Sequence, residues 1–294
     1  MRTFLIAVLF TVVLSSCTTQ SPPQQVVPTI EPYGCVPSGS WVLGESGKRI
    51  SINNIIPKHG ILLAGEMHTD MPTHLWQYYL VVEAYNKNPD MVITMESFPR
   101  STQPILDKWT TGDYGNNLGE FYKAVNWKTV WGYDIFLYEP LLRFAQQNNI
   151  PIIGMNVDKA LIKSIKSVGW DNTPIIYKEN LSRPAEASAD YIENLKFIYK
   201  MHQYENKEGA PTQANFITAQ TVWDRAFAES IAENFNKGKL VVAIVGQGHV
   251  QYGWGIEHQL KQLGITKVFK FAPWHKAMSC EYFNGTSADI FYGI

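Results

Sequence analysis

Five short apolar runs divide the chain, at residues 61–64, 91–95, 151–155, 240–245 and 267–271. Each run is rich in Ile, Val or Leu and is bounded by Gly, Pro or Asn, and none alternates strictly with polar residues. This pattern is typical of strands that are covered on both faces. The runs therefore predict the buried strands of a largely parallel sheet.

Helical patterns lie between these runs. One starts after Asp70 and Pro72, a cap and first-turn pair, and continues to about residue 86. Others cover about 138–148, 212–236 and 255–263, and glycines follow the last two. Because strands alternate with helices, we expect an α/β fold with a mainly parallel sheet flanked by helices.

Residues 158–211 interrupt this alternation. They contain amphipathic patterns, notably at 185–204, but no apolar run of the buried-strand type. We therefore expect a helical insertion at about 158–211 within a single α/β domain that spans 34–294. The insertion is rich in aromatic residues and contains one histidine among them. These residues are Tyr177, Tyr191, Phe197, Tyr199, His202 and Tyr204.

The first residues predict export. Arg2 precedes an apolar run at 4–13, which is shorter than the roughly 20 residues that a membrane-spanning helix needs, so 1–16 is typical of a secretory signal peptide. Leu-Ser-Ser-Cys at 14–17 resembles the bacterial lipobox and predicts that Cys17 is acylated; an ordinary signal peptide with an incidental Cys17 is the alternative. Thr18 in place of Asp favours the outer over the inner membrane of the bacterial envelope.

The composition changes after the lipid site. Residues 17–33 are mainly Ser, Thr, Gln and Pro with little to bury, which is typical of a flexible tether. The whole chain is 45% hydrophobic and 17% charged with a net charge of -1, so it has the composition of a globular protein. It contains no run of like charge, which argues against nucleic acid as a partner.

Two cysteines remain after Cys17. Cys35 and Cys280 lie at opposite ends of the mature domain. Because export brings a chain into an oxidising compartment, we expect a disulfide between them, with two separate buried thiols as the alternative.

Polar residues follow four of the predicted strands. Glu66 and His68 come after the first, Glu96 after the second, Asn156 after the third and His249 after the fourth. Ligands bind at the carboxyl ends of the strands in open parallel sheets. Each histidine alone is more often structural, but together Glu66, His68, Glu96 and His249 predict a functional cluster that binds a divalent metal or performs acid–base chemistry.

Other motifs limit the function further. Asp224 and Arg225, on the long predicted helix, are either partners of this cluster or a surface ion pair. The glycines beside His68 and His249 lack the remaining residues of nucleotide-binding loops. No Gly-x-Ser-x-Gly motif is present, which argues against a serine hydrolase of the usual α/β type.

Several motifs in this order resemble one family. They are Leu-Ala-Gly-Glu-Met-His at 63–68, Met-Glu-Ser-Phe at 95–98, Trp131, Tyr-Glu-Pro at 138–140, Gln-Thr-Val-Trp-Asp-Arg at 220–225, and Gly-Gln-Gly-His-Val-Gln-Tyr-Gly at 246–253. With the lipobox, they resemble the ChaN-like haem-binding lipoproteins, of a superfamily that includes erythromycin esterases and Tiki proteases. In one departure, Thr73-His74 stands where relatives usually have two histidines, which weakens the expectation of enzymatic activity.

The resemblance implies haem binding, a part in iron and haem acquisition, a homodimer that sandwiches haem, and an outer-membrane haem receptor as a partner. Tyr and His are both ligands of haem iron. Within the insertion, Tyr204 and His202 are the first candidates and Tyr199 and Tyr191 the next; alternatively, these aromatics only pack its helices. A second hypothesis is a hydrolase in which the cluster of Glu and His residues activates water.

Overall fold

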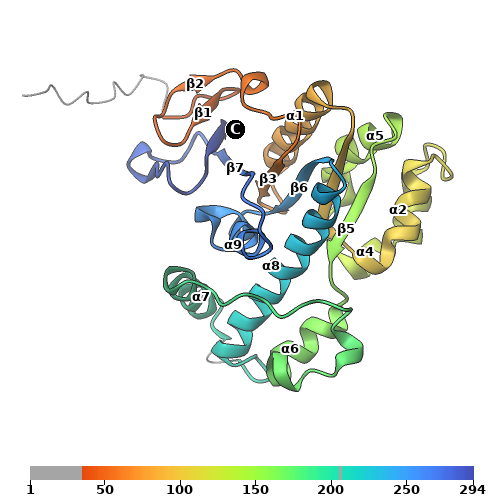
Figure 1. Cartoon of the computed structure of the whole chain (residues 1–294), viewed down its shortest axis with the longest axis vertical. Helices are drawn as coiled ribbons and strands as arrows, with labels where there is room; N and C mark the ends of the chain where they lie inside the picture. Colours follow the sequence, from red (N-terminus) through yellow and green to blue (C-terminus); the bar gives the residue numbers. More distant parts are fainter. Residues whose placement is uncertain (1–34, 205–206) are drawn as a thin grey trace, which may run out of the picture. The chain divides into compact units, whose positions relative to one another are not determined.

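The computed structural model describes residues 35–204 and 207–294, which belong to one compact unit, Glu31–Ile294. An eight-stranded sheet with the order β2-β1-β8-β7-β3-β6-β4-β5 lies at its centre (Figure 1). The strands are β1 (Trp41–Leu43), β2 (Arg49–Ile50), β3 (Ile61–Glu66), β4 (Met91–Pro99), β5 (Ile152–Asn156), β6 (Leu240–Gly246), β7 (Val268–Trp274) and β8 (Ile290–Gly293).

The sheet is parallel from β8 to β5 and antiparallel at β1 and β2. In its centre, Ile61 of β3 is in register with Val241 of β6 and Val268 of β7. All five predicted strands are present, and the predicted α/β class with a mainly parallel sheet is confirmed. The three short strands β1, β2 and β8 were not predicted, because two to four residues are too few to show a period.

Helices cover both faces of the sheet. They are α1 (Met71–Lys87), α2 (Gln103–Thr110), α3 (Leu118–Ala124), α4 (Trp127–Val130), α5 (Glu139–Gln147), α6 (Lys159–Asn172), α7 (Ala189–Met201), α8 (Gln213–Asn236) and α9 (Ile256–Gln262). Side chains on β3 alternate between two cores: Leu62 packs with α1 to α5, whereas Leu63 packs with α6, α8 and α9. Burial on both faces explains the continuous apolar pattern of the central strands.

The order of the strands creates a crevice at their carboxyl ends. The chain passes from β3 to β4 through α1 on one face, and from β6 to β7 through α9 on the other. The strand order therefore reverses at the β3–β6 pair, which is where ligands bind in open α/β sheets. Glu66 ends β3 beside Gly246 at the end of β6.

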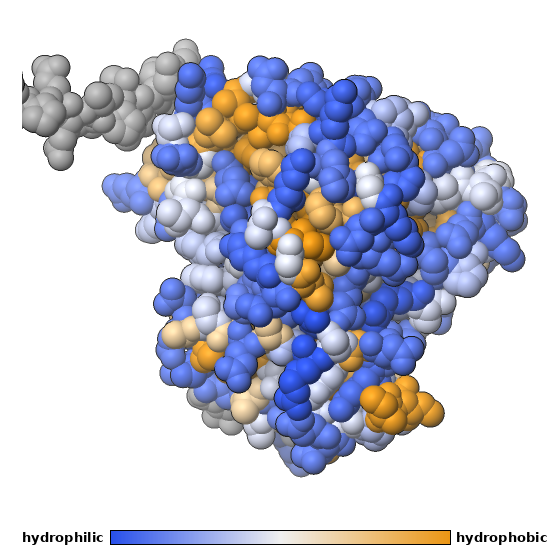
Figure 2. All heavy atoms as spheres, viewed as in Figure 1, coloured by the Kyte–Doolittle hydropathy of each residue, from blue (hydrophilic) through white to orange (hydrophobic). Residues whose placement is uncertain are grey.

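The predicted insertion contains α6, a short 3-10 helix (Ile175–Tyr177) and α7, with no strand among its described residues. Helix α6 packs into the α8 side of the core, whereas α7 forms a separate small cluster with the start of α8. The face shown in Figure 2 is mostly hydrophilic, with hydrophobic residues exposed in separate patches. No helix in the described ranges has the length and apolar character that crossing a membrane requires.

Candidate functional site at the carboxyl edge of the sheet

Glu66 and His68 form the first part of the site. Asp70 caps α1 by accepting a hydrogen bond from the Thr73 backbone N–H, as predicted, so His68 lies in the short connection between β3 and α1. The Nδ1 atom of His68 lies 2.7 Å from Oε1 of Glu66, whose side chain is almost completely buried. The same Glu66 oxygen accepts a hydrogen bond of 2.7 Å from the Tyr138 hydroxyl group.

Other side chains hold this pair in place. The indole N–H of Trp131 donates to the Tyr138 hydroxyl oxygen at 2.9 Å, and the Trp131 ring packs edge-on against His68. His74 lies on the far side of Glu66, with 3.7 Å between its Nδ1 and Oε2. Oε1 of the buried carboxylate is thus held by His68 and Tyr138, whereas Oε2 has no hydrogen-bond partner among the described residues.

Glu96 forms the centre of the site. It lies where the β4–β5 register shifts between Met95 and Pro99, and such an irregularity re-aims a side chain. Its Oε2 accepts a hydrogen bond of 2.6 Å from the Gly246 backbone N–H. A Cβ atom on Gly246 would lie 2.9 Å from the His68 ring and 3.3 Å from Glu96 Oε2, so only glycine fits between these groups.

His249 forms the third part, in a short 3-10 helix after β6. Its Nδ1 lies 2.6 Å from Oδ1 of Asp224, which is fully buried on α8. The other Asp224 oxygen accepts a hydrogen bond of 2.9 Å from the Tyr191 hydroxyl group. The Nε2 atom of His249 lies 3.8 Å from Oε1 of Glu96, so Glu96 stands beside both histidine–carboxylate pairs.

These carboxylates raise the pKa of both histidines. Burial lowers the pKa of His249, but the charge and hydrogen bond of Asp224 outweigh it and bring the pKa to about 9. At His68 burial also opposes protonation, and the hydrogen bond to Glu66 with the charge of Glu96 raises the pKa above its ordinary value. Burial, followed by the charge of Glu66, raises the pKa of Tyr138, so its hydroxyl group stays a donor.

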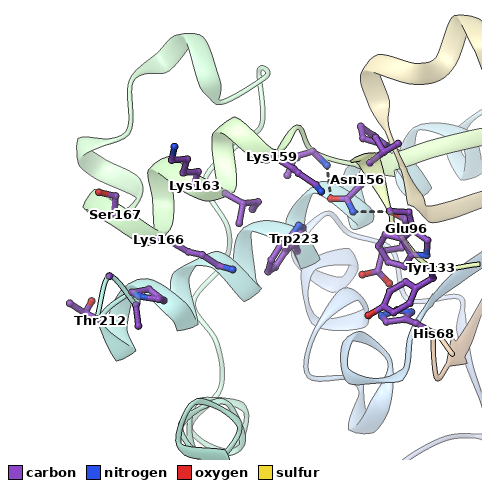
Figure 3. A pocket seen from close by; sticks show the side chains of 18 residues that line it. His68, Glu96, Tyr133, Asn156, Lys159, Lys163, Lys166, Ser167, Thr212 and Trp223 are labelled. Carbon is purple, nitrogen blue, oxygen red and sulfur yellow. Dashed lines mark hydrogen bonds between the residues drawn. The ribbon is translucent and has the colours of Figure 1, made fainter. Parts of the chain in front are cut away.

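A cavity of about 960 Å³ opens from this cluster. His68, Glu96 and Tyr133 line one end, and Lys163, Lys166 and Thr212 line the other (Figure 3). Trp131 also lines the cavity. The ring of Tyr133 lies 5.3 Å from that of His68. The site therefore combines ionisable groups at the sheet edge with a large and partly apolar space.

The sequence matches the family model described as "Haem-binding uptake, Tiki superfamily, ChaN" over residues 54–260. The chain belongs to this ChaN family. The match covers the sheet edge and all four residues of the predicted cluster. A search among curated proteins finds no match.

Among solved structures, the chain is similar to ChaN of Campylobacter jejuni, described with cofacial heme binding. The TM-score is 0.67 at 16% identity, over 86% of this chain and 95% of that one. The erythromycin esterase EreC, as a mutant in its open conformation, has a TM-score of 0.46 at 10% identity, over 80% and 77% of the two chains. At 16% identity, the likeness to ChaN of Campylobacter jejuni shows that the two chains share a fold.

In this ChaN-family chain the structure brings the four predicted cluster residues together and adds three more. Asp224 is a partner of the cluster, whereas Arg225 turns away to Ser182 and Glu229. Tyr138 and His74 bond to or contact Glu66, although the sequence predicted no such contact. Two features of the sequence could have indicated these contacts with Glu66. Tyr138 belongs to a family motif, and His74 lies on the first turn of a helix that follows a strand.

The aromatic residues of the insertion lie elsewhere. Tyr191 and Tyr199 are buried, and their hydroxyl groups donate to Asp224 and to the Pro211 carbonyl oxygen. Tyr204 packs against Tyr199 and Phe216, and His202 is exposed. None of these four candidates for haem ligation is among the residues that line the cavity.

Cys35 and Cys280 lie side by side. The backbone N–H of Cys35 lies 2.7 Å from Sγ of Cys280, and the two thiols are free in the structure. Burial, followed by the hydrogen bond with Cys280, raises the pKa of Cys35 to about 11. The predicted disulfide thus stays a prediction, for which the fold supplies the proximity. Cys17 and the rest of 1–34 lie outside the described residues.

No group of three or more His, Cys, Asp and Glu side chains in the described part of the chain is arranged to hold a metal ion. In the cluster, each imidazole faces its own carboxylate, and Oε2 of Glu96 is engaged by a backbone N–H. The arrangement observed is therefore two histidine–carboxylate pairs on either side of a third carboxylate.

Proposed function

We propose that this chain is a haem-binding protein that takes part in haem and iron acquisition at the bacterial envelope. The observation that carries the proposal is the cavity of about 960 Å³, which has the size of a site for a large organic ligand. Haem needs extensive apolar contact and a ligand for its iron. Membership of a haem-binding family supports the same function.

Two side chains in the cavity are suited to ligate the iron. The Nδ1 atom of His68 is bound to Glu66, which leaves Nε2 for a metal, the usual arrangement of a histidine ligand. Tyr133 is 39% exposed and lines the same end of the cavity. We therefore place the iron near His68 and Tyr133. Tyr204 and His202 remain candidates only for haem bound elsewhere on the insertion.

A haem titration tests this proposal. The purified chain from about Pro32 onward is titrated with ferric haem while the absorption spectrum and the molecular mass are recorded. We expect a saturable Soret shift that His68→Ala or Tyr133→Phe weakens and that Tyr204→Phe leaves unchanged. An absence of saturable binding in the wild-type chain would contradict the proposal, and an effect of Tyr204→Phe alone would move the site to the insertion.

We further propose that the protein is a lipid-anchored homodimer. Cofacial heme binding in the similar structure of Campylobacter jejuni ChaN supports a haem-linked pair of subunits, and the lipobox at Cys17 supports an anchor in the outer membrane. An outer-membrane haem receptor would then be the partner that receives or supplies haem. A rise to dimer mass during the haem titration is the expected sign of the pairing.

The Asp224–His249 pair favours a second function, hydrolysis by acid–base chemistry. A carboxylate that orients an imidazole is the usual arrangement of a catalytic histidine. Because the pKa of His249 is about 9, this imidazole would act as the general acid near neutral pH, and Glu96, 3.8 Å away, lines the cavity. We expect any hydrolysis of a chromogenic ester to be lost in His249→Gln, while haem affinity stays unchanged. Unchanged hydrolysis in that variant would exclude this role for His249.

A further inference from the structure

Helix α1 carries a row of exposed apolar side chains. Met71, Leu75 and Tyr79 are four residues apart, so they lie on one face of the helix, which we call the α1 face. Their side chains are 41%, 37% and 47% exposed, and none of them packs in a hydrophobic core of the described residues. Contiguous apolar exposure of this kind is typical of a surface that another segment or molecule covers.

One end of the α1 face adjoins an aromatic surface. The ring of Tyr79 lies 6.5 Å from that of Tyr292 on β8, and the Tyr292 ring lies 4.6 Å from that of Trp41 on β1. Tyr292 and Trp41 are both partly exposed. Surfaces lined by aromatic rings bind segments that contain proline, because such segments favour the extended polyproline II conformation.

The described part of the chain begins beside this aromatic surface. Ser38 pairs with Gly293, which follows Tyr292 on β8. The backbone N–H of Gly39 donates to the Gly293 carbonyl oxygen at 2.9 Å. The segment that precedes residue 35 is therefore joined to the domain close to Tyr292 and, through it, to the α1 face.

The apolar residues of this preceding segment gather at the end nearest the domain. Residues 18–25 are only Ser, Thr, Gln and Pro, whereas 26–33 contain two valines, an isoleucine and a tyrosine together with two prolines. Val27, Ile30 and Tyr33 are three residues apart. Polyproline II has three residues per turn, so in that conformation these side chains would share one side of the segment.

We propose that residues 26–33 lie along the α1 face and cover it, with Tyr33 at its aromatic end. In polyproline II, the stretch from Val27 to Tyr33 spans roughly 19 Å. The helical rise from Met71 to Tyr79 is roughly 12 Å, so the segment is long enough to cover the whole row. Removal of both apolar surfaces from water stabilises the contact, and the two prolines reduce the entropy lost on ordering.

This contact shortens the link between the lipid and the domain. With 26–33 bound to α1, only residues 17–25 separate a lipid on Cys17 from the domain, and they span at most roughly 30 Å. The free segment 17–34 spans up to roughly 60 Å. The anchored domain is then held closer to the membrane than the length of its N-terminal segment implies.

Photochemical cross-linking tests the contact. The lipid-free chain from Thr18 onward carries p-benzoylphenylalanine in place of Ile30 and is irradiated, and the linked peptides are identified by mass spectrometry. We expect a link to residues 71–79 of the same chain, and none to α1 when the photoreactive residue replaces Gln20 instead. A link to another element, or no link, would overturn the proposal. A product of dimer mass would show that a second copy meets this segment, which also overturns it.

Oxidation of Met71 by hydrogen peroxide measures the cover directly. In the double variant Val27→Asp, Ile30→Asp we expect Met71 to oxidise faster than in the wild type, by roughly threefold or more, because the segment no longer shields it. Met201, which is 67% exposed on α7, should oxidise at the same rate in both proteins. The matched control Gln20→Asp, Gln24→Asp adds the same charges to the polar half and should leave Met71 protected. Equal rates at Met71 in the wild type and the first variant would refute the contact.

Discussion

The hydroxyl group of Tyr138 connects two buried polar groups at the Glu66 end of the site. It donates to Glu66 and accepts from Trp131. In Tyr138→Phe the buried carboxylate loses a donor and the indole N–H loses its acceptor, so we expect the free energy of unfolding to fall by about 1–3 kcal/mol.

Urea unfolding of the two proteins measures this change. Tyr85→Phe is a suitable control, because the Tyr85 ring packs against the same core and its hydroxyl group makes no hydrogen bond among the described residues. Equal midpoints for the wild type and Tyr138→Phe would show that the Glu66 carboxylate finds its hydrogen bonds elsewhere.

His249 gives the stability of the protein a dependence on pH. Its pKa is about 9 in the folded state and about 6.5 in the unfolded chain. Below pH 6.5 both states hold the proton and the stabilisation is complete. Between pH 6.5 and 9 only the folded state holds it, so the free energy of unfolding falls as pH rises, by up to about 3 kcal/mol.

Urea unfolding at several values between pH 6 and 9.5 tests this behaviour. In His249→Gln we expect a flatter profile across that window, because the variant has no imidazole to titrate there. Parallel profiles for the two proteins would mean that His249 titrates alike in the folded and unfolded states, which would contradict its strong interaction with Asp224.

At the scale of elements, the segment before β1 and the segment between β7 and β8 meet through Cys35 and Cys280. Their sequence separation of 245 residues means that a disulfide would close almost the whole domain into one loop. In the oxidised protein we predict no free thiol from this pair. Reduction should lower the free energy of unfolding by about 2–5 kcal/mol.

Thiol titration before and after reduction measures the pairing directly. Cys35→Ser should match the reduced wild type in stability and should show no further response to reductant. Two free thiols in the unfolded but unreduced wild-type protein would contradict the disulfide and leave the two side chains as partly buried neighbours.

At the scale of the whole molecule, the N-terminal sequence predicts where the domain is held. If Cys17 carries lipid, labelled palmitate should be incorporated into the protein and the protein should sediment with the outer membrane. Cys17→Ala should remove the label and release the protein, since a tether of Ser, Thr, Gln and Pro has no affinity for lipid of its own. Label retained in that variant would contradict acylation at Cys17.

The sequence by itself determined the fold class and most of the residues of the edge cluster. Buried strands are continuous apolar runs, and the polar groups directly after parallel strands must meet at one edge of the sheet. Glu66 and His249 follow from that rule, because each comes at or just after the end of a strand. Glu96 follows the predicted apolar run at 91–95 but lies inside β4, where the pairing with β5 shifts.

Only the tertiary structure decided how these groups are paired. Asp224 lies in the middle of α8 and Tyr138 just before α5, where local pattern gives no sign that they face His249 and Glu66. Tyr191, a candidate haem ligand from its aromatic surroundings, is instead a hydrogen-bond donor to Asp224. Such partners come from segments that are distant in the sequence and that packing brings together. The type of a residue does not by itself indicate which distant residue it contacts. The sequence also did not predict that Lys159, Lys163 and Lys166 of α6 line the cavity. Their spacing is ordinary for an exposed helix face, and only the fold turns that face towards the cavity.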